Sequence, residues 1–188
     1  MCICKPFHFY SKWKKGVIRL TQDTRLPPSV SLDLGALSEP LSVALHASDR
    51  ANVPQSSTIL VFGAGAVGLL CAAVSKVVDK ATKVVIADIQ ADRVNFAVQN
   101  GFADAGVVVP MPAKRPETIE EKLAFAKEVA DLVKGTRVKS TISGEPETRE
   151  SLVGDVTATY ECTGVESCLQ SAIYVGRFAL AILFYPYL

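Results

Sequence analysis

The sequence predicts an α/β protein built on a doubly wound parallel sheet with helices on both faces. Two short apolar runs, residues 58–62 (TILVF) and 83–87 (KVVIA), show no alternation of polar and apolar residues. Such runs are expected for strands that are buried on both faces of a sheet. A segment with helical spacing follows each run. Strands that alternate with helices are joined by right-handed crossovers, which makes the sheet parallel.

The expected elements follow one another along the chain. From Ser31 onward, small and apolar residues recur at helical spacing, with Asp33 as the N-cap. We expect this helix to break near Glu39, because Pro40 weakens a helix. Gly101 is expected to close the helix before it. Further helices are expected at residues 66–78, 91–100, 117–134 and 165–174, and strands at residues 58–62, 83–87, 106–109 and 157–161.

The connection at residues 135–154 is polar and shows no periodic pattern, so we expect an exposed loop there. The apolar tail that follows Arg177 could add a fifth strand. Six strands are usual in this architecture, and we expect only four to five, hence an incomplete sheet. Its exposed edge would invite association, which leaves a homo-oligomer open.

The composition limits the classes of partner. Lys and Arg number 20 against 19 for Asp and Glu, so no net charge attracts nucleic acid or anionic lipid. The five cysteines include no CxxC pair, which favours reduced thiols. The N-terminal residues lack the apolar core of a secretory signal, and no apolar stretch is long enough to span a membrane. We therefore expect a cytoplasmic protein that binds neither nucleic acid nor membrane.

The strongest motif is residues 63–68 (GAGAVG), which fit GxGxxG between an expected strand and an expected helix. In a dinucleotide-binding Rossmann unit, Gly63 would permit the tight turn and Gly65 would let the backbone approach a pyrophosphate. Gly68 would let the helix pack closely on the strand. Ala66 and Val67 open the helix, whose free N–H groups favour an anion.

The residue that selects the coenzyme is expected to be Asp88, at the end of the next strand. Its carboxylate can accept hydrogen bonds from the hydroxyls of the adenosine ribose and would repel a 2′-phosphate. NAD is therefore predicted over NADP. Arg93 has two interpretations: it lies against the adenine or its ribose, or it is an exposed charge on a helix.

Four motifs in order and spacing resemble one family. Residues 35–47 (GALSEPLSVALHA), 61–70 (VFGAGAVGLL), 87–93 (ADIQADR) and 160–164 (YECTG) are similar to the sorbitol and xylitol branch of the zinc-dependent medium-chain alcohol dehydrogenases. The resemblance covers about residues 26–175.

The resemblance implies NAD-dependent oxidation of a secondary alcohol in a polyol to a ketone. A catalytic zinc in the complete family lowers the pKa of the bound alcohol, which makes it the better hydride donor. The resemblance also implies site residues: Val67, Asp88 and Arg93 on the coenzyme, and Glu39 beside the substrate and the zinc-bound water. The turn at residues 161–164, with Cys162, Thr163 and Gly164, would lie near the nicotinamide.

No zinc site is expected in this chain, because the family's ligands lie in a catalytic domain that would precede Leu26. Glu39 and His46 are about 10.5 Å apart along a helix axis, too far for one metal. The early cysteines and His8 lack zinc-site spacing. The sequence thus predicts four parts: an unmatched segment (1–25), a remnant of the catalytic domain with a helix (26–54), an NAD-binding domain (55–175) and an unmatched tail (176–188).

Three functions follow from these features. The first is the coenzyme part of a polyol dehydrogenase that binds NAD but does not oxidise alcohols by itself. The second is a regulatory module that binds a nucleotide without chemistry. The third is an inactive, truncated product with an exposed apolar tail. The motif at residues 35–47 favours the enzyme lineage, because a module that only senses nucleotides has no evident use for it.

Overall fold

The computed structural model describes residues 26–112, 114, 116–141 and 148–176 of the chain. Within these residues the chain forms two compact units, one reaching from residue 26 to 38 and the other from residue 39 to 176. The larger unit holds the sheet and is an α/β domain with a four-stranded parallel sheet, as the sequence predicts. No helix in the described part of the chain is both long enough and apolar enough to cross a membrane.

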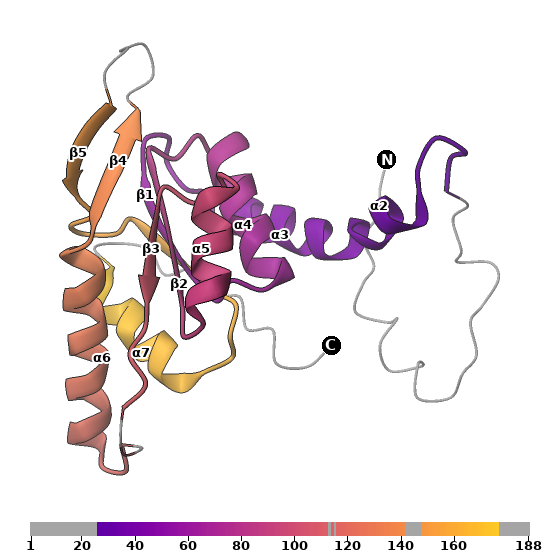
Figure 1. Cartoon of the computed structure of the whole chain (residues 1–188). Coiled ribbons are helices and arrows are strands. Elements are labelled where there is room, and N and C mark those ends of the chain that lie inside the picture. The colour runs from indigo at the N-terminus through magenta and orange to yellow at the C-terminus, as the bar shows by residue number, and fades with distance from the viewer. Residues whose placement is uncertain (1–25, 113, 115, 142–147, 177–188) are drawn as a thin grey trace, which may run out of the picture. The chain divides into compact units, whose positions relative to one another are not determined.

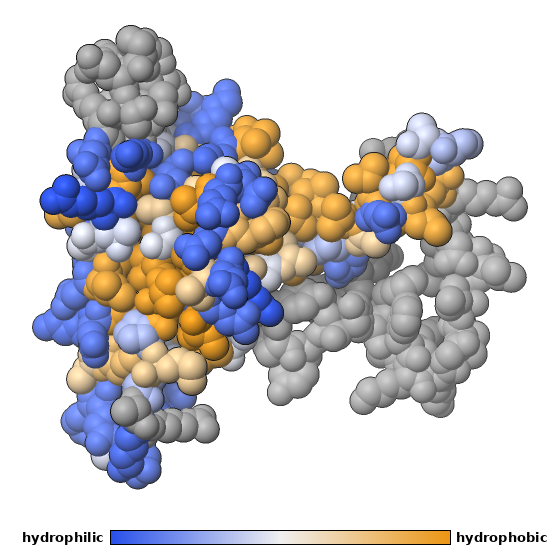
Figure 2. Space-filling view, viewed as in Figure 1, coloured by the Kyte–Doolittle hydropathy of each residue, from blue (hydrophilic) through white to orange (hydrophobic). Residues whose placement is uncertain are grey.

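The smaller unit contains the short helix α2 (Leu32–Ala36). Its N-cap is Ser31, whose Oγ accepts a hydrogen bond from the N–H of Leu34 at 3.2 Å. The prediction that Asp33 caps the helix is wrong, because the serine two residues earlier takes the cap and leaves Asp33 in the first turn. Hydrophobic side chains lie on the surface of α2 (Figure 2), and none of its residues is buried. The core is therefore built without α2.

Helix α3 (Ser38–Ala51) begins after a break at Leu37, two residues from the predicted position. Pro40 lies in the first turn, where a missing N–H removes no intrahelical hydrogen bond. Ala44 and Ala47 are buried in the core. The hydroxyl of Ser48 donates to Oδ1 of Asp79 at 2.5 Å, which fastens α3 to the chain that follows α4.

The sheet has the strand order β3-β2-β1-β6, with every neighbouring pair parallel. In Figure 1 the helices cover both of its faces. The chain builds β1, β2 and β3 outward in one direction and then returns to place β6 on the other side of β1. The strands are β1 (Thr58–Phe62), β2 (Lys83–Asp88), β3 (Ala105–Val108) and β6 (Ala158–Glu161).

The four remaining helices lie within two residues of their predicted ends. Gly101 follows the C-cap of α5 with a φ of 76°, the left-handed conformation predicted for a closing glycine. Thr118 and Glu121 form a capping box at the start of α6, and two backbone hydrogen bonds lower the pKa of the Glu121 carboxyl. The helices are α4 (Ala66–Val77), α5 (Ala91–Gln99), α6 (Ile119–Lys134) and α7 (Glu166–Val175).

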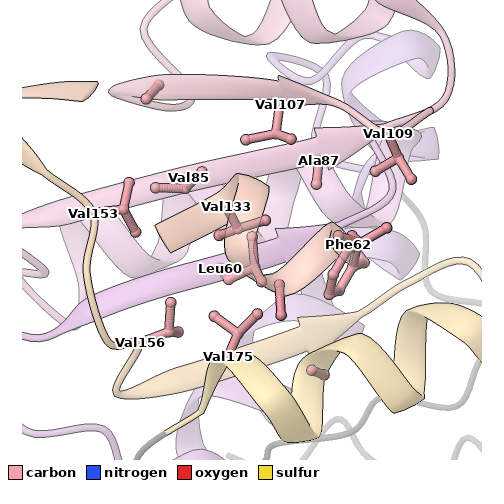
Figure 3. Close-up of a cluster of buried hydrophobic side chains, with 14 of the residues drawn as sticks. Leu60, Phe62, Val85, Ala87, Val107, Val109, Val133, Val153, Val156 and Val175 are labelled. Carbon is pink, nitrogen blue, oxygen red and sulfur yellow. The ribbon is translucent and has the colours of Figure 1, made fainter. Parts of the chain in front are cut away.

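Alternate residues of each strand enter two separate cores, which explains the unbroken apolar runs. Leu60 and Phe62 of β1 point to the face covered by α6 and α7, where they meet Val133 and Val175 (Figure 3). Ile59 and Val61 point to the opposite face, among residues of α3, α4 and α5. The sheet is therefore buried on both sides.

The segment at residues 135–154, predicted to be a structureless loop, instead contains an antiparallel hairpin. Its strands are β4 (Arg137–Thr141) and β5 (Thr148–Leu152). Val138 and the adjoining Val153 are buried against the α6 side of the core. The hairpin is not evident in the sequence, because its strands have too few apolar residues to show an alternation of apolar and polar positions.

We predict that Leu60→Ala destabilises the domain by about 2–5 kcal/mol, because it removes a fully buried side chain from the central strand. Urea unfolding would measure the change. Leu132→Ala is the matched control: Leu132 is 44% exposed on α6, and its loss is expected to change the unfolding free energy by less than about 0.5 kcal/mol. Equal effects of the two substitutions would contradict the assignment of the core.

Candidate functional site

The candidate site lies where the carboxyl ends of β1, β2 and β6 meet at one edge of the sheet. The strand order reverses beside β1, since β2 and β3 lie on one side and β6 on the other. In open α/β sheets, ligands bind in the crevice outside the carboxyl ends of the strands at such a reversal. Residues 63–68, which follow β1, therefore stand at the position that the fold favours for a ligand.

The first and third glycines of the motif have separate geometric requirements. Gly63 has a φ of 97°, which L side chains rarely adopt, and its N–H donates to the carbonyl of Ala87 at 2.7 Å. A Cβ atom on Gly68 would lie 1.8 Å from the carbonyl oxygen of Gly63. Helix α4 can therefore lie against the turn only because residue 68 has no side chain.

The amino end of α4 is open. Gly65 is the N-cap, and no side chain caps the helix. A Cβ atom on Gly65 would meet nothing within 4 Å, and Gly65 and Ala66 are both exposed. Val67 is half-buried and packs against the core. The first N–H groups of a helix have no intrahelical partners, so this end can receive an anion.

Asp88 is the last residue of β2, and its side chain binds the backbone of two loops, the one after β1 and the one after β2. Its Oδ2 accepts from the N–H of Ala64 at 2.8 Å, and its Oδ1 accepts from the N–H of Gln90 at 2.9 Å. The side chain is only 9% exposed. A carboxylate oxygen can accept more than one hydrogen bond, so a ribose hydroxyl would share these oxygens with the backbone. Asp88 therefore also orders the turn after β1, a role that its sequence position does not predict.

Arg93 is exposed on α5, five residues beyond Asp88. It takes part in none of the ion pairs found in the described part of the chain. The structure places it near the strand end without choosing between the two interpretations of its role.

The turn between β6 and α7 lies directly beside residues 63–68. A Cβ atom on Gly63 would lie 3.0 Å from Cγ2 of Thr163 and 3.3 Å from the carbonyl carbon of Cys162. Gly164 has a φ of 72°, so this turn also requires a glycine. The structure thus places Cys162 and Thr163 beside Gly63, with Gly164 in the same turn.

Glu161 is the functional candidate that sequence reasoning did not single out. It is the last residue of β6 and is fully buried. One carboxylate oxygen, Oε1, accepts from the N–H of Thr163 at 2.7 Å and from its hydroxyl, and Oε2 accepts from the N–H of Gly164 at 3.0 Å. The sequence holds one sign of this role: like Asp88, Glu161 is an acid at the end of a predicted strand.

Three free thiols are found among the described residues. Cys71 of α4 is buried and shares a hydrogen bond with Cys162, which, together with burial, raises the pKa of the Cys162 thiol. Burial chiefly raises the pKa of the Cys168 thiol. The raised pKa values of Cys162 and Cys168 keep these two groups as neutral thiols, which are poor nucleophiles.

A zinc ion does not fit the described residues. Nowhere in the described ranges do three His, Cys, Asp or Glu side chains meet in a metal-binding group. Glu39 and His46 are both exposed on α3, and the structure does not bring either to a second ligand. Cys2, Cys4 and His8 lie outside the described residues.

Comparisons with known proteins point to one group of enzymes. The chain is 36% identical over 153 residues to the sorbitol dehydrogenase of Gallus gallus, a match that covers 81% of this chain and 35% of that protein. It is 49% identical over 73 residues to the D-xylulose reductase A of Aspergillus niger, covering 39% of this chain and 20% of that protein. The chain spans about a third of the length of the sorbitol dehydrogenase.

The fold is similar to that of solved alcohol dehydrogenases. The benzyl alcohol dehydrogenase of Acinetobacter calcoaceticus superposes with a TM-score of 0.55 at 24% identity, over 88% of this chain and 38% of that one. No family model matches the sequence.

We predict that Gly68→Ala destabilises the domain by about 1–3 kcal/mol, because the added methyl group forces α4 away from the carbonyl of Gly63. Urea unfolding would again provide the measurement. Gly65→Ala, three residues earlier in open space, should leave the unfolding free energy nearly unchanged. A Gly68→Ala protein as stable as the original would show that the close approach is not required.

Proposed function

We propose that the described domain binds NAD, as the coenzyme-binding part of a zinc-dependent polyol dehydrogenase. The similarity to a sorbitol dehydrogenase and a D-xylulose reductase supports this proposal. The observation that carries the proposal is the open, uncapped amino end of α4 at Gly65. The pyrophosphate would accept hydrogen bonds from backbone N–H groups of residues 65–68, with Gly63 shaping the turn. Asp88 would accept from the adenosine ribose.

The nicotinamide half of the coenzyme would lie toward β6. Asp88 belongs to β2, on one side of β1, and the turn at Cys162, Thr163 and Gly164 follows β6, on the other. A dinucleotide whose pyrophosphate lies over α4 and whose adenosine meets Asp88 must extend its other end toward this turn. Arg93, on the adenosine side, would lie against the adenine or its ribose.

For the whole protein we propose NAD-dependent oxidation of a secondary alcohol of a polyol to a ketone. The coenzyme supplies the acceptor for the hydride. The described residues offer no zinc site, so no step of the alcohol chemistry is assigned to them. Glu39 would lie beside the substrate in such an enzyme. The unpaired thiols at residues 71, 162 and 168 suit a reducing compartment such as the cytoplasm.

A second candidate is a nucleotide-binding module without chemistry. It is favoured by the lack of any group of three metal-binding side chains in the described ranges. Both candidates depend on the same NAD site. They are separated by whether the whole protein oxidises a polyol.

Calorimetric titration of NAD into the full chain tests the proposed site. We expect saturable binding at one site, and we expect Gly65→Ala to weaken it by about tenfold or more, because the new methyl group would occupy space that the pyrophosphate needs. Gly65→Ala should retain its stability, so lost affinity would not reflect unfolding. Absence of NAD binding by the unaltered, folded chain would overturn the proposal.

The preference for NAD over NADP tests Asp88 separately. In Asp88→Ala both coenzymes should lose affinity, because the N–H of Ala64 loses its acceptor. NAD should lose roughly 10- to 100-fold more than NADP, because only NAD offers the 2′-hydroxyl and only NADP is repelled by the carboxylate. The ratio of the two dissociation constants is the measurement. An unchanged ratio would mean that Asp88 only orders the turn.

A further inference from the structure

Glu161 is a buried carboxylate whose charge no cation balances among the described residues. None of the ion pairs found there includes it, and its partners are two backbone N–H groups and one hydroxyl. These dipoles stabilise the ionised form but leave its net charge in place. A buried charge acts over a longer range than an exposed one, because less water screens it.

Glu161 lies on the nicotinamide side of the proposed site. It pairs in register with Phe62, the residue just before the turn at Gly63, and it folds the turn whose Thr163 adjoins Gly63. Asp88, the other buried acid, lies at the end of β2 on the opposite side of β1. Asp88 and Glu161 would therefore lie near different halves of a dinucleotide that is bound across the sheet edge.

The negative charge of Glu161 also acts on the two thiols nearest to it, Cys162 and Cys168. Burial is the main reason why the pKa of the Cys168 thiol is raised, and the negative charges of Glu161 and Asp88 raise it further. Glu161 also adds to the rise in the pKa of Cys162. A field that disfavours a new negative charge at these positions favours a positive one.

The two redox forms of the coenzyme differ in the charge of the nicotinamide ring. The nicotinamide ring carries a positive charge in NAD⁺ and none in NADH, whereas the adenosine and pyrophosphate are the same in both. We propose that the charge of Glu161 shifts coenzyme binding toward the oxidised form, NAD⁺. This inference rests on the proposed function, since it requires the nicotinamide to lie beside the turn between β6 and α7.

The test is Glu161→Gln in the full chain, with dissociation constants measured by calorimetry for NAD⁺, NADH and ADP-ribose. We expect NAD⁺ to lose on the order of tenfold more affinity than NADH, as the loss of one poorly screened charge near a cation implies. ADP-ribose has no nicotinamide and reports the adenosine half alone. A distortion of the turn would weaken NAD⁺ and NADH equally, so the ratio of their constants isolates the charge.

Two variants serve as controls. Glu166→Gln removes the same charge from the first turn of α7, where the side chain is 64% exposed and pairs with Lys122, and should leave the ratio unchanged. Glu161→Asp keeps the charge on a shorter side chain and should retain the original ratio even if both affinities fall. An unchanged ratio in Glu161→Gln, or an equal shift in Glu161→Asp, would overturn the inference. Failure of the unaltered chain to bind ADP-ribose would instead overturn the proposed function, and the inference with it.

Discussion

The close approach of α4 to the turn after β1 is the contact on which the site depends. Only a residue without a side chain at position 68 lets the helix begin against the carbonyl of Gly63. That contact aims the amino end of α4 along the edge of the sheet. The turn itself lies beside Thr163, so the loops after β1 and β6 are neighbours. Moving α4 outward would separate all of these groups at once.

Two buried acids, Asp88 and Glu161, complete this edge by accepting hydrogen bonds from the backbone of the adjoining loops. Asp88 accepts from the N–H of Ala64, and Glu161 accepts from the N–H groups of Thr163 and Gly164. The loop amides nearest the strands are thereby satisfied within the protein, and the uncapped end of α4 keeps its donors for an anion. The acids therefore order the loops at the strand ends, while the uncapped end of α4 stays open to an anion.

The sequence predicts the parts of this structure that depend on local pattern. Unbroken apolar runs locate β1 and β2, and the spacing of Gly63, Gly65 and Gly68 locates the turn between β1 and α4. Sequence patterns do not predict features that depend on a single contact in the folded protein. Ser31 takes the cap from Asp33, and the β4–β5 hairpin is held to the core by Val138 and the adjoining Val153. Glu161 is recognisable in the sequence as an acid at a strand end, but its burial is not, because burial depends on strands that are distant in sequence.

The packing of α3 decides which of its residues reach the core and which stay on the surface. Ala44, Ala47 and Ser48 turn inward, the alanines into the core and the serine onto Asp79, so one face of the helix is committed to the domain. Glu39 and His46 lie exposed as a result. A metal near Glu39 would need two or more further ligands, and the described residues supply none beside it. The coenzyme site needs no such contribution: its glycines, its acids and its helix end all belong to one sheet edge.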